Sequence, residues 1–219
     1  QVIAENGFAD RIKVLPKLSR ELDAERDLGG RVDLIVSEIV SNELLDEAVL
    51  LTMEHAIAHL LKPGGQVIPA RGSIRIALAF DARFGNRRMG MVSGFNLSAF
   101  NYLAKPKHQL KMSDPNVRLM SEPVDAFDFD LGSAVQVPGA RKELCLVAQG
   151  GPVNCVAQWI RLQLDEEVEY ENSPGTPGFS TWAVLAYPLP QQIESKPGQK
   201  VTVHCAHDRY RVRFWVLSQ

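Results

Sequence analysis

The feature that most constrains this chain is a change in sequence pattern after Pro69. Beyond it, β-rich or alternating runs follow one another and are separated by turns containing Gly, Pro and Asn. Short runs of this kind with regular turn signals are typical of an all-β barrel or sandwich. The predicted strands cover 73–80, 134–138, 142–149, 154–164, 181–189, 200–207 and 210–217. We therefore expect residues 70–219 to form one β module.

The first 69 residues have a different pattern, which predicts an α/β unit. The run "VDLIVS" (32–37) is continuously apolar, as in a parallel strand that is covered on both faces. Residues 48–61 keep Leu50, Met53 and Ile57 at helical spacing, and "KPGG" after them is a helix stop. The segments "RIKVL" (11–15) and "QVIPA" (66–70) are further predicted strands.

Residues 81–112 interrupt the predicted strands with an irregular segment that is rich in large apolar side chains. We interpret it as an insertion near 81–104 that carries these side chains outward and serves in association with another chain. The residues concerned are Phe84, Met89, Met91, Phe95, Phe100 and Tyr102, beside Arg83.

Charge and cysteine content exclude several classes of partner. Lys plus Arg is 24 and Asp plus Glu is 26, so the net charge of −2 gives no strong field to hold nucleic acid or a membrane surface. No apolar run approaches the roughly 18 residues of a membrane span. The three cysteines lack CxxC spacing, so we expect reduced thiols and a cytoplasmic protein.

The loop "SEIVSNELLDE" (37–47) places four acids after the predicted strand 32–37. One interpretation is a charged helix cap, in which Asp46 and Glu47 favour the positive N-terminal end of the next helix. The other is a binding site, because open α/β sheets bind ligands at the carboxyl ends of their strands. Glu38 and Glu47 could then converge on one point, and two carboxylates suit a planar guanidinium cation.

No metal site is predicted. His55 and His59 have helical i, i+4 spacing but no third ligand nearby, and the neighbours in "HCAHD" (204–208) alternate between the faces of a strand. Arg209, Arg211 and Arg213 share one strand face, which we interpret as solvated, with binding of an acidic partner as the alternative.

The nine-residue step from Glu38 to Glu47 resembles the double-glutamate loop of the protein arginine N-methyltransferases. Other segments agree in order along the chain. They are "ENGFADRIKVLPKLSREL" (5–22), "EHAIAHLLKPGGQVIPARG" (54–72), "VSGFNLSAF" (92–100) and "HCAHDRYRVRFWVL" (204–217). Within the family the chain is most similar to the type III, monomethylating branch, on the basis of Glu43, "EHA…HLL" and "AHDRY".

The resemblance implies a fold and a set of roles. Residues 1–69 would be the C-terminal part of a Rossmann-like domain that binds S-adenosylmethionine, and 70–219 a β-barrel with a dimerisation arm. Glu38 and Glu47 would be catalytic and hold the guanidinium of an arginine-containing protein or peptide. Glu43, Thr181 and Trp182 would bind the substrate, and Leu18 and Ser19 the adenine of the cofactor. A homodimer is implied as well.

The sequence also departs from the family pattern. Thr181 in "STW" stands where the family has histidine, and we find no glycine-rich cofactor turn followed by an acid. The chain opens in mid-helix without Met, so we expect a fragment that is inactive alone. Two alternatives remain, a non-catalytic binding or dimerisation module and a methyltransferase that acts on a small guanidine compound.

Overall fold

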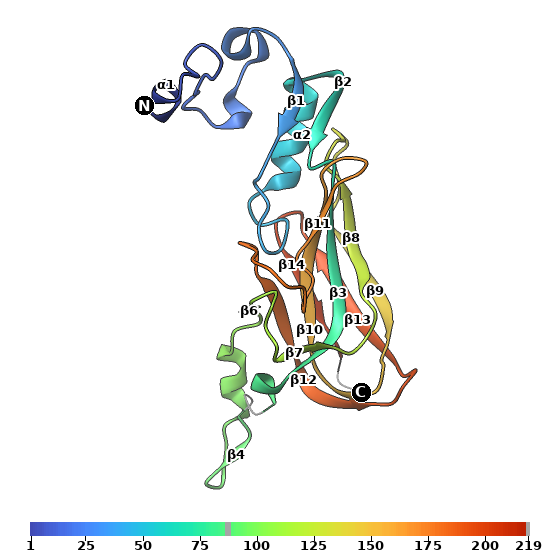
Figure 1. Ribbon diagram of the computed structural model, residues 1–219. Coiled ribbons are helices and arrows are strands. Elements are labelled where there is room, and N and C mark those ends of the chain that lie inside the picture. Colours follow the sequence, from blue (N-terminus) through green and yellow to red (C-terminus); the bar gives the residue numbers. More distant parts are fainter. Residues whose placement is uncertain (86–88, 218–219) are drawn as a thin grey trace.

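The computed structural model describes residues 1–85 and 89–217, apart from the side chain of Tyr102. Figure 1 shows an elongated molecule with the N-terminal segment at one end and the long strands of a β module below it. A small α/β unit lies between the two, and a narrow arm projects from the far end of the β module. Among the described residues, no helix is long and apolar enough to cross a membrane.

The α/β unit confirms the helix and the parallel strand pair that were predicted. Strand β1 (Val32–Val36) pairs in parallel with β2 (Leu61–Ile68), and helix α2 (Val49–His59) connects them. Only short helical turns precede β1, namely α1 (Val2–Glu5), the 3-10 turn η1 (Ser19–Glu21) and the π-helical turn η2 (Ala24–Leu28).

Two expectations for this unit were wrong. Residues 11–15 form no strand, because a strand needs a hydrogen-bonded neighbour and the sheet contains only β1 and β2. Strand β1 is not covered on both faces, since Leu34 and Val36 are 44% and 68% exposed. The "KPGG" stop lies inside β2, where the register with β1 is irregular between Val32 and Leu34.

The β module consists of a seven-stranded and a three-stranded antiparallel sheet, with register given by long ladders. The first contains β3 (Arg71–Asp81), β6 (His108–Leu110), β7 (Val117–Leu119), β8 (Val124–Asp130), β10 (Gly151–Gln163), β11 (Glu169–Glu171) and β12 (Val184–Ser195). The second contains β9 (Ala140–Val147), β13 (Lys200–His207) and β14 (Val212–Trp215). The predicted strand at 134–138 does not form, and β8 was not predicted.

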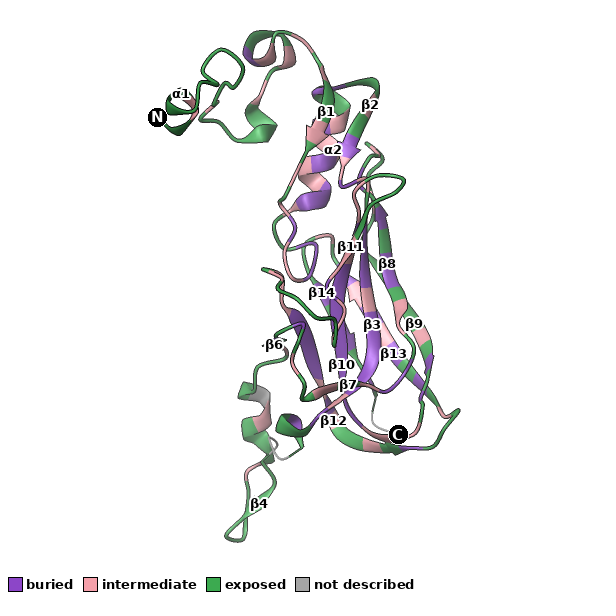
Figure 2. Ribbon diagram, in the orientation of Figure 1, coloured by how far each residue is buried: buried purple, intermediate pink, exposed green. Residues whose placement is uncertain are grey.

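The two sheets enclose an apolar core, which makes the module a flattened barrel. Ile76 of β3, Val156 of β10 and Val203 of β13 are fully buried in the same cluster. Figure 2 shows this burial as purple along β3, β10 and β12. Leu44 and Leu45, from the loop that follows β1, belong to the same core. The α/β unit and the barrel are therefore joined by apolar packing.

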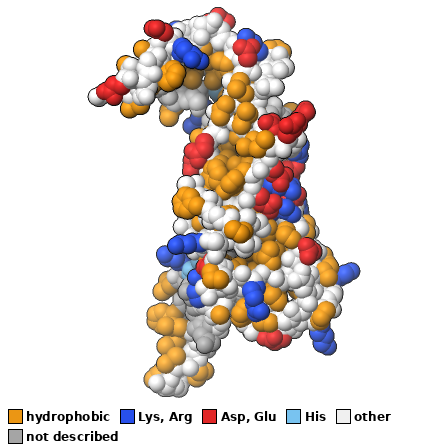
Figure 3. Space-filling view, viewed as in Figure 1, with side chains coloured by type: hydrophobic (Ala, Val, Ile, Leu, Met, Phe, Trp, Pro, Cys, Tyr) orange, Lys and Arg blue, Asp and Glu red, His pale blue; other side chains and the backbone are white. Residues whose placement is uncertain are grey.

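The arm leaves the barrel after β3. It contains the 3-10 turns η3 (Ala82–Phe84) and η4 (Ser98–Leu103) and a small hairpin of β4 (Met91–Val92) and β5 (Phe95–Asn96). Met91, Phe95 and Leu103 are 68%, 71% and 81% exposed, and Figure 3 shows hydrophobic patches on the arm. Phe84 is an exception, since it is buried in a second apolar cluster with Ala77 of β3 and Trp159 of β10. Residues 86–88 of the predicted insertion lie outside the described residues.

Candidate functional site

The acidic loop connects the carboxyl end of β1 to the start of α2. Glu38 and Glu47 lie at its two ends, and both side chains are exposed. Between them, Leu44 and Leu45 are fully buried in the barrel core. Leu44 adopts φ +70°, a left-handed conformation that turns the loop back toward α2. The loop therefore holds its centre in the core and presents its two terminal glutamates to solvent.

Three hydrogen bonds from the barrel hold this loop in place. Trp182 Nε1 donates to the carbonyl oxygen of Val40 at 2.7 Å. Gln158 Nε2 of β10 donates to the carbonyl oxygen of Asn42 at 2.9 Å, and the Asn42 side chain accepts from the amide of Ala183 at 2.6 Å. Because these partners belong to the barrel, the barrel determines where the loop lies.

Trp182 is itself held in place from several sides. Its carbonyl oxygen accepts from Asn172 Nδ2 at 3.0 Å, and its ring meets the edge of Tyr170 at a centroid distance of 5.2 Å. The Ser180 hydroxyl accepts a hydrogen bond from the amide of Trp182 and donates one to the carbonyl oxygen of Trp182. Thr181 is exposed beside them. The structure thus brings Trp182 to the loop and leaves Thr181 at the surface.

Glu43 differs from the two terminal glutamates because it is buried, with 3% of its side chain exposed. Tyr187 donates its hydroxyl to Glu43 Oε1 at 2.8 Å, and Lys107 forms an ion pair with the same carboxylate. Burial, together with the charge of Glu43, raises the pKa of Tyr187 well above its usual range. Burial and the same charge also raise the pKa of Asp46.

A cavity of about 400 Å³ opens beside Glu43. Its lining comes from the acidic loop, the residues before and within β6, and β12, namely Asn42, Glu43, Asp46, Lys105, Lys107, His108, Gln109 and Leu185. Both signs of charge line this cavity. Glu43 was predicted to bind substrate, but its carboxylate is already engaged by Lys107 and Tyr187 of the same chain.

Leu18 and Ser19 lie at the start of η1, away from the acidic loop in sequence but against helix α2 in space. Leu18 is 64% exposed, and Ser19 is exposed as well. Arg20 of the same turn lies near His55 of α2. Burial first, then the charges of His59 and Arg20, lower the pKa of His55. Leu18 and Ser19 therefore lie beside α2, and the apolar side chain of Leu18 is available for contact.

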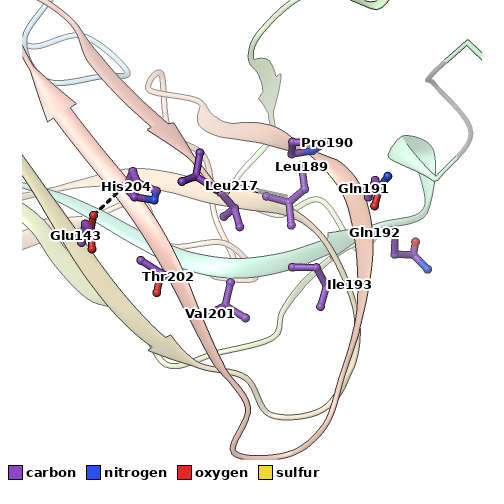
Figure 4. Close-up of a pocket in the computed structure, with 11 residues that line it drawn as sticks. Glu143, Leu189, Pro190, Gln191, Gln192, Ile193, Val201, Thr202, His204 and Leu217 are labelled. Atoms are coloured by element: carbon purple, nitrogen blue, oxygen red, sulfur yellow. Dashed lines mark ion pairs between the residues drawn. The ribbon is translucent and has the colours of Figure 1, made fainter. Parts of the chain in front are cut away.

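The structure also places the histidines that were weighed as metal ligands. The rings of His55 and His59 lie 4.6 Å apart, and no cluster of three or more metal-ligating side chains occurs within the described part of the chain. His204 stacks on Trp215 outside the barrel, whereas His207 lies inside between two phenylalanines, as strand alternation predicted. A cavity of about 480 Å³ beside His204 is lined from β9, β12, β13 and the chain end, and contains none of the predicted site residues (Figure 4).

Sequence reasoning missed the residues that hold the loop, namely Asn42, Lys107, Gln158 and Tyr187. One signal was available. Gln158 interrupts the apolar run of strand 154–164, and a polar side chain at a fully buried position requires a hydrogen-bond partner.

Several proteins of known sequence are similar to this chain. The chain is 31% identical over 214 residues to an arginine N(omega)-methyltransferase of Streptomyces achromogenes subsp. streptozoticus, covering 97% of this chain and 59% of that protein. It is 28% identical to protein arginine N-methyltransferase 7 of Oryza sativa subsp. japonica, covering 80% and 26%, and 24% identical to that of Danio rerio, covering 95% and 34%. No protein-family model matches the chain.

Comparison with solved structures identifies the fold. The chain superposes with a TM-score of 0.78 on the Trypanosoma brucei PRMT1 enzyme–prozyme heterotetrameric complex with AdoHcy, at 20% identity. The match covers 93% of this chain and 65% of that one. The α/β unit and barrel therefore have the fold of the C-terminal part of an arginine methyltransferase.

The sequence comparisons make the relationship more specific. This chain is similar to arginine N-methyltransferases along nearly its whole length, which confirms the predicted resemblance to that family. It spans about 59% of the Streptomyces protein and smaller shares of the rice and zebrafish proteins.

Proposed function

We propose that the protein to which this chain belongs transfers a methyl group from S-adenosylmethionine to the guanidinium of arginine. The observation that carries the proposal is the acidic loop, whose two exposed glutamates, Glu38 and Glu47, follow a parallel strand and precede α2. The barrel fixes this loop through Trp182. The names of the sequence relatives support the same activity.

The two glutamates supply what guanidinium chemistry requires. Arginine is protonated at neutral pH, and its delocalised nitrogen lone pairs make it a poor nucleophile. Carboxylates on two sides would hydrogen-bond the nitrogens that do not react and would bias positive charge toward them. They would also align the reacting nitrogen with the methyl donor. Such orientation can contribute several kcal/mol, within the roughly 7–11 kcal/mol assigned to well-oriented reactants.

The surrounding residues would complete the arginine pocket. Trp182 lies against the loop and would form an apolar wall, and Thr181 is exposed beside it at the position of the family histidine. We assign Glu43 a positioning role at the edge of the pocket, because its charge is met by Lys107 and Tyr187. Asp46 is exposed and lines the cavity beside Glu43, where it would meet basic groups of a substrate.

S-adenosylmethionine would supply an electrophilic methyl group on a sulfonium. Of the residues predicted to hold it, Leu18 fits an adenine ring, because its apolar side chain is 64% exposed beside Ser19. The glycine-rich turn and the following acid are not found in these 219 residues. We therefore propose that this chain by itself does not transfer methyl groups and that the activity belongs to the natural protein that contains it.

The substrate has two candidate classes. The rice and zebrafish relatives are named protein arginine N-methyltransferases, which favours an arginine-containing protein or peptide as the substrate. The Streptomyces relative is named an arginine N(omega)-methyltransferase, without the word protein. This name favours a small guanidine compound as the second candidate substrate. A non-catalytic binding module is the further alternative. We also propose that the protein is a cytoplasmic homodimer that associates through its arm.

A transfer assay tests the proposal. The natural protein is incubated with radiolabelled S-adenosylmethionine in three separate reactions. Their acceptors are an arginine peptide, free arginine, and the same peptide with lysine in place of arginine. Label on either arginine compound but not on the lysine peptide supports the proposal, and their ratio identifies the substrate class. Donor binding without label on any compound would favour the non-catalytic module.

A further inference from the structure

Helix α2 is tied to the barrel by an ion pair between Glu54 and Arg209. Arg209 Nη2 donates to Glu54 Oε2, and the two side chains are only 14% and 16% exposed. The other oxygen, Glu54 Oε1, accepts the backbone amide of Val137 at 3.1 Å. Both oxygens of one glutamate on α2 are thus engaged by the β module. Arg209 was predicted on a solvated face, and this prediction was wrong.

Arg209 lies in a tight turn between β13 and β14. Arg209 adopts φ +79°, a left-handed conformation that few residues other than glycine occupy. The preceding Asp208 stabilises the turn, because its Oδ1 accepts the amides of Tyr210 at 3.0 Å and Arg211 at 2.7 Å. These backbone donors lower the pKa of Asp208. An unfavourable backbone conformation persists where its surroundings determine it, and the ion pair with Glu54 is part of those surroundings.

The ion pair also lies at an informative place along the chain. Only Ala48 separates Glu47 from α2, and Glu54 lies on that helix seven positions after Glu47. On the other side of Glu47, the loop is fixed by the bond from Trp182 to Val40. Glu47 therefore lies between two attachments to the same barrel, one before it and one after it.

We propose that Arg209 and Glu54 are positioning residues for methyl transfer, which set the place of Glu47 relative to Trp182 through helix α2. This inference rests on the proposed function of the acidic loop. Because a displacement of about 1 Å can reduce a rate about a hundredfold, a pair that never touches the substrate can control turnover. Removing it should lower kcat and leave the KM of the methyl donor unchanged.

The test uses four single variants of the natural protein. Arg209→Met removes the guanidinium and keeps the apolar stem, Arg209→Lys keeps a cation for Glu54, and Glu54→Gln removes the opposing charge. Asp33→Asn is the matched control, because Asp33 forms an exposed ion pair with Lys62 in the same α/β unit. We expect kcat to fall roughly ten- to a hundredfold for Arg209→Met and Glu54→Gln, and about twofold or less for Arg209→Lys and Asp33→Asn.

Amide hydrogen exchange over residues 49–59 gives a second measurement that does not depend on activity. Exchange should be faster in Arg209→Met than in the parent and unchanged in Asp33→Asn, since the pair holds α2. If Arg209→Met fails to fold, Glu54→Gln and Arg209→Lys give the same comparison. Parent-like kcat or parent-like exchange in Glu54→Gln would overturn the inference. A parent that transfers no methyl group contradicts the proposed function instead, and exchange then decides alone whether the pair holds the helix.

Discussion

Trp182 is the residue at which the barrel meets the acidic loop. Its indole N–H satisfies the carbonyl of Val40, which is buried with 3% of the residue exposed. An aromatic side chain with one polar group suits such a position, because the ring fills apolar space while the N–H reaches a partner. The identity of this side chain therefore matters for both stability and the shape of the arginine pocket.

Replacing Trp182 with Phe tests this double role. The variant keeps an aromatic ring beside Tyr170 but leaves the Val40 carbonyl without its donor. We expect the free energy of unfolding to fall by about 1–3 kcal/mol in urea denaturation, and the methyl-transfer rate to fall with it. Trp215→Phe is the control, since Trp215 lies outside the barrel against His204. Equal losses in both variants would contradict the role of Trp182.

His207 gives a prediction about pH. It is buried between Phe127 and Phe129, and burial lowers its pKa below the usual value of 6.5. The unfolded chain therefore binds a proton at a higher pH than the folded one. Stability should be full above about pH 6.5 and should fall as the pH is lowered below it, until the folded form is protonated as well.

The measurement is urea denaturation between pH 5 and pH 7.5. His207→Leu should flatten the pH dependence of the free energy of unfolding, because the unfolded chain then no longer takes up a proton at position 207. Val203→Ala should leave the slope in place, since Val203 is buried on the same face of β13 and has no titratable group. A parent-like slope in His207→Leu would show that another group is responsible.

At the scale of elements, the arm leaves several large apolar side chains exposed. Its hairpin and 3-10 turn leave Met91, Phe95, Phe100 and Leu103 between 55% and 81% exposed. Patches of this kind mark surfaces that associate. We expect the double substitution Phe95→Ser with Leu103→Ser to convert a dimer of the natural protein into monomer in sedimentation velocity. The control is Val135→Ser, at an exposed position on the barrel. A dimer that survives the double substitution would place association elsewhere.

Elements were predictable from sequence where local pattern and tertiary partners agree. The helix predicted over 48–61 is α2 (Val49–His59), and the strand predicted over 154–164 is β10 (Gly151–Gln163). Residues 11–15 have strand-like composition but no neighbouring strand with which to pair. Strand formation depends on such partners more than helix formation does. The alternation of "VDAFDFD" in β8 was a usable signal that was overlooked.

The candidate site was predictable only in part for the same reason. Spacing alone suggested that Glu38 and Glu47 belong together, and the structure places both at the exposed ends of one loop. Nothing local indicates that Glu43 meets Tyr187, which lies 144 positions later in the chain. Contacts of this range depend on the packing of the loop against the barrel, and residue pattern does not encode that packing.

At the scale of the whole molecule, the site lies at the junction of two units with different patterns. The α/β unit supplies the glutamates, and the barrel supplies Trp182, Gln158 and the anchor of α2. This arrangement explains why Leu44 and Leu45 are buried in the barrel core although they belong to a loop of the α/β unit. Neither unit alone contains the proposed arginine pocket.

The most direct test of the central claim is single-turnover methyl transfer to arginine by the Glu38→Gln and Glu47→Gln variants of the natural protein. Both substitutions keep shape and remove charge, so each should lower the rate at least about a hundredfold while donor binding is retained. Glu122→Gln, on the barrel surface, should leave the rate unchanged. Parent-like transfer by both loop variants would contradict the proposal that these two glutamates hold the guanidinium.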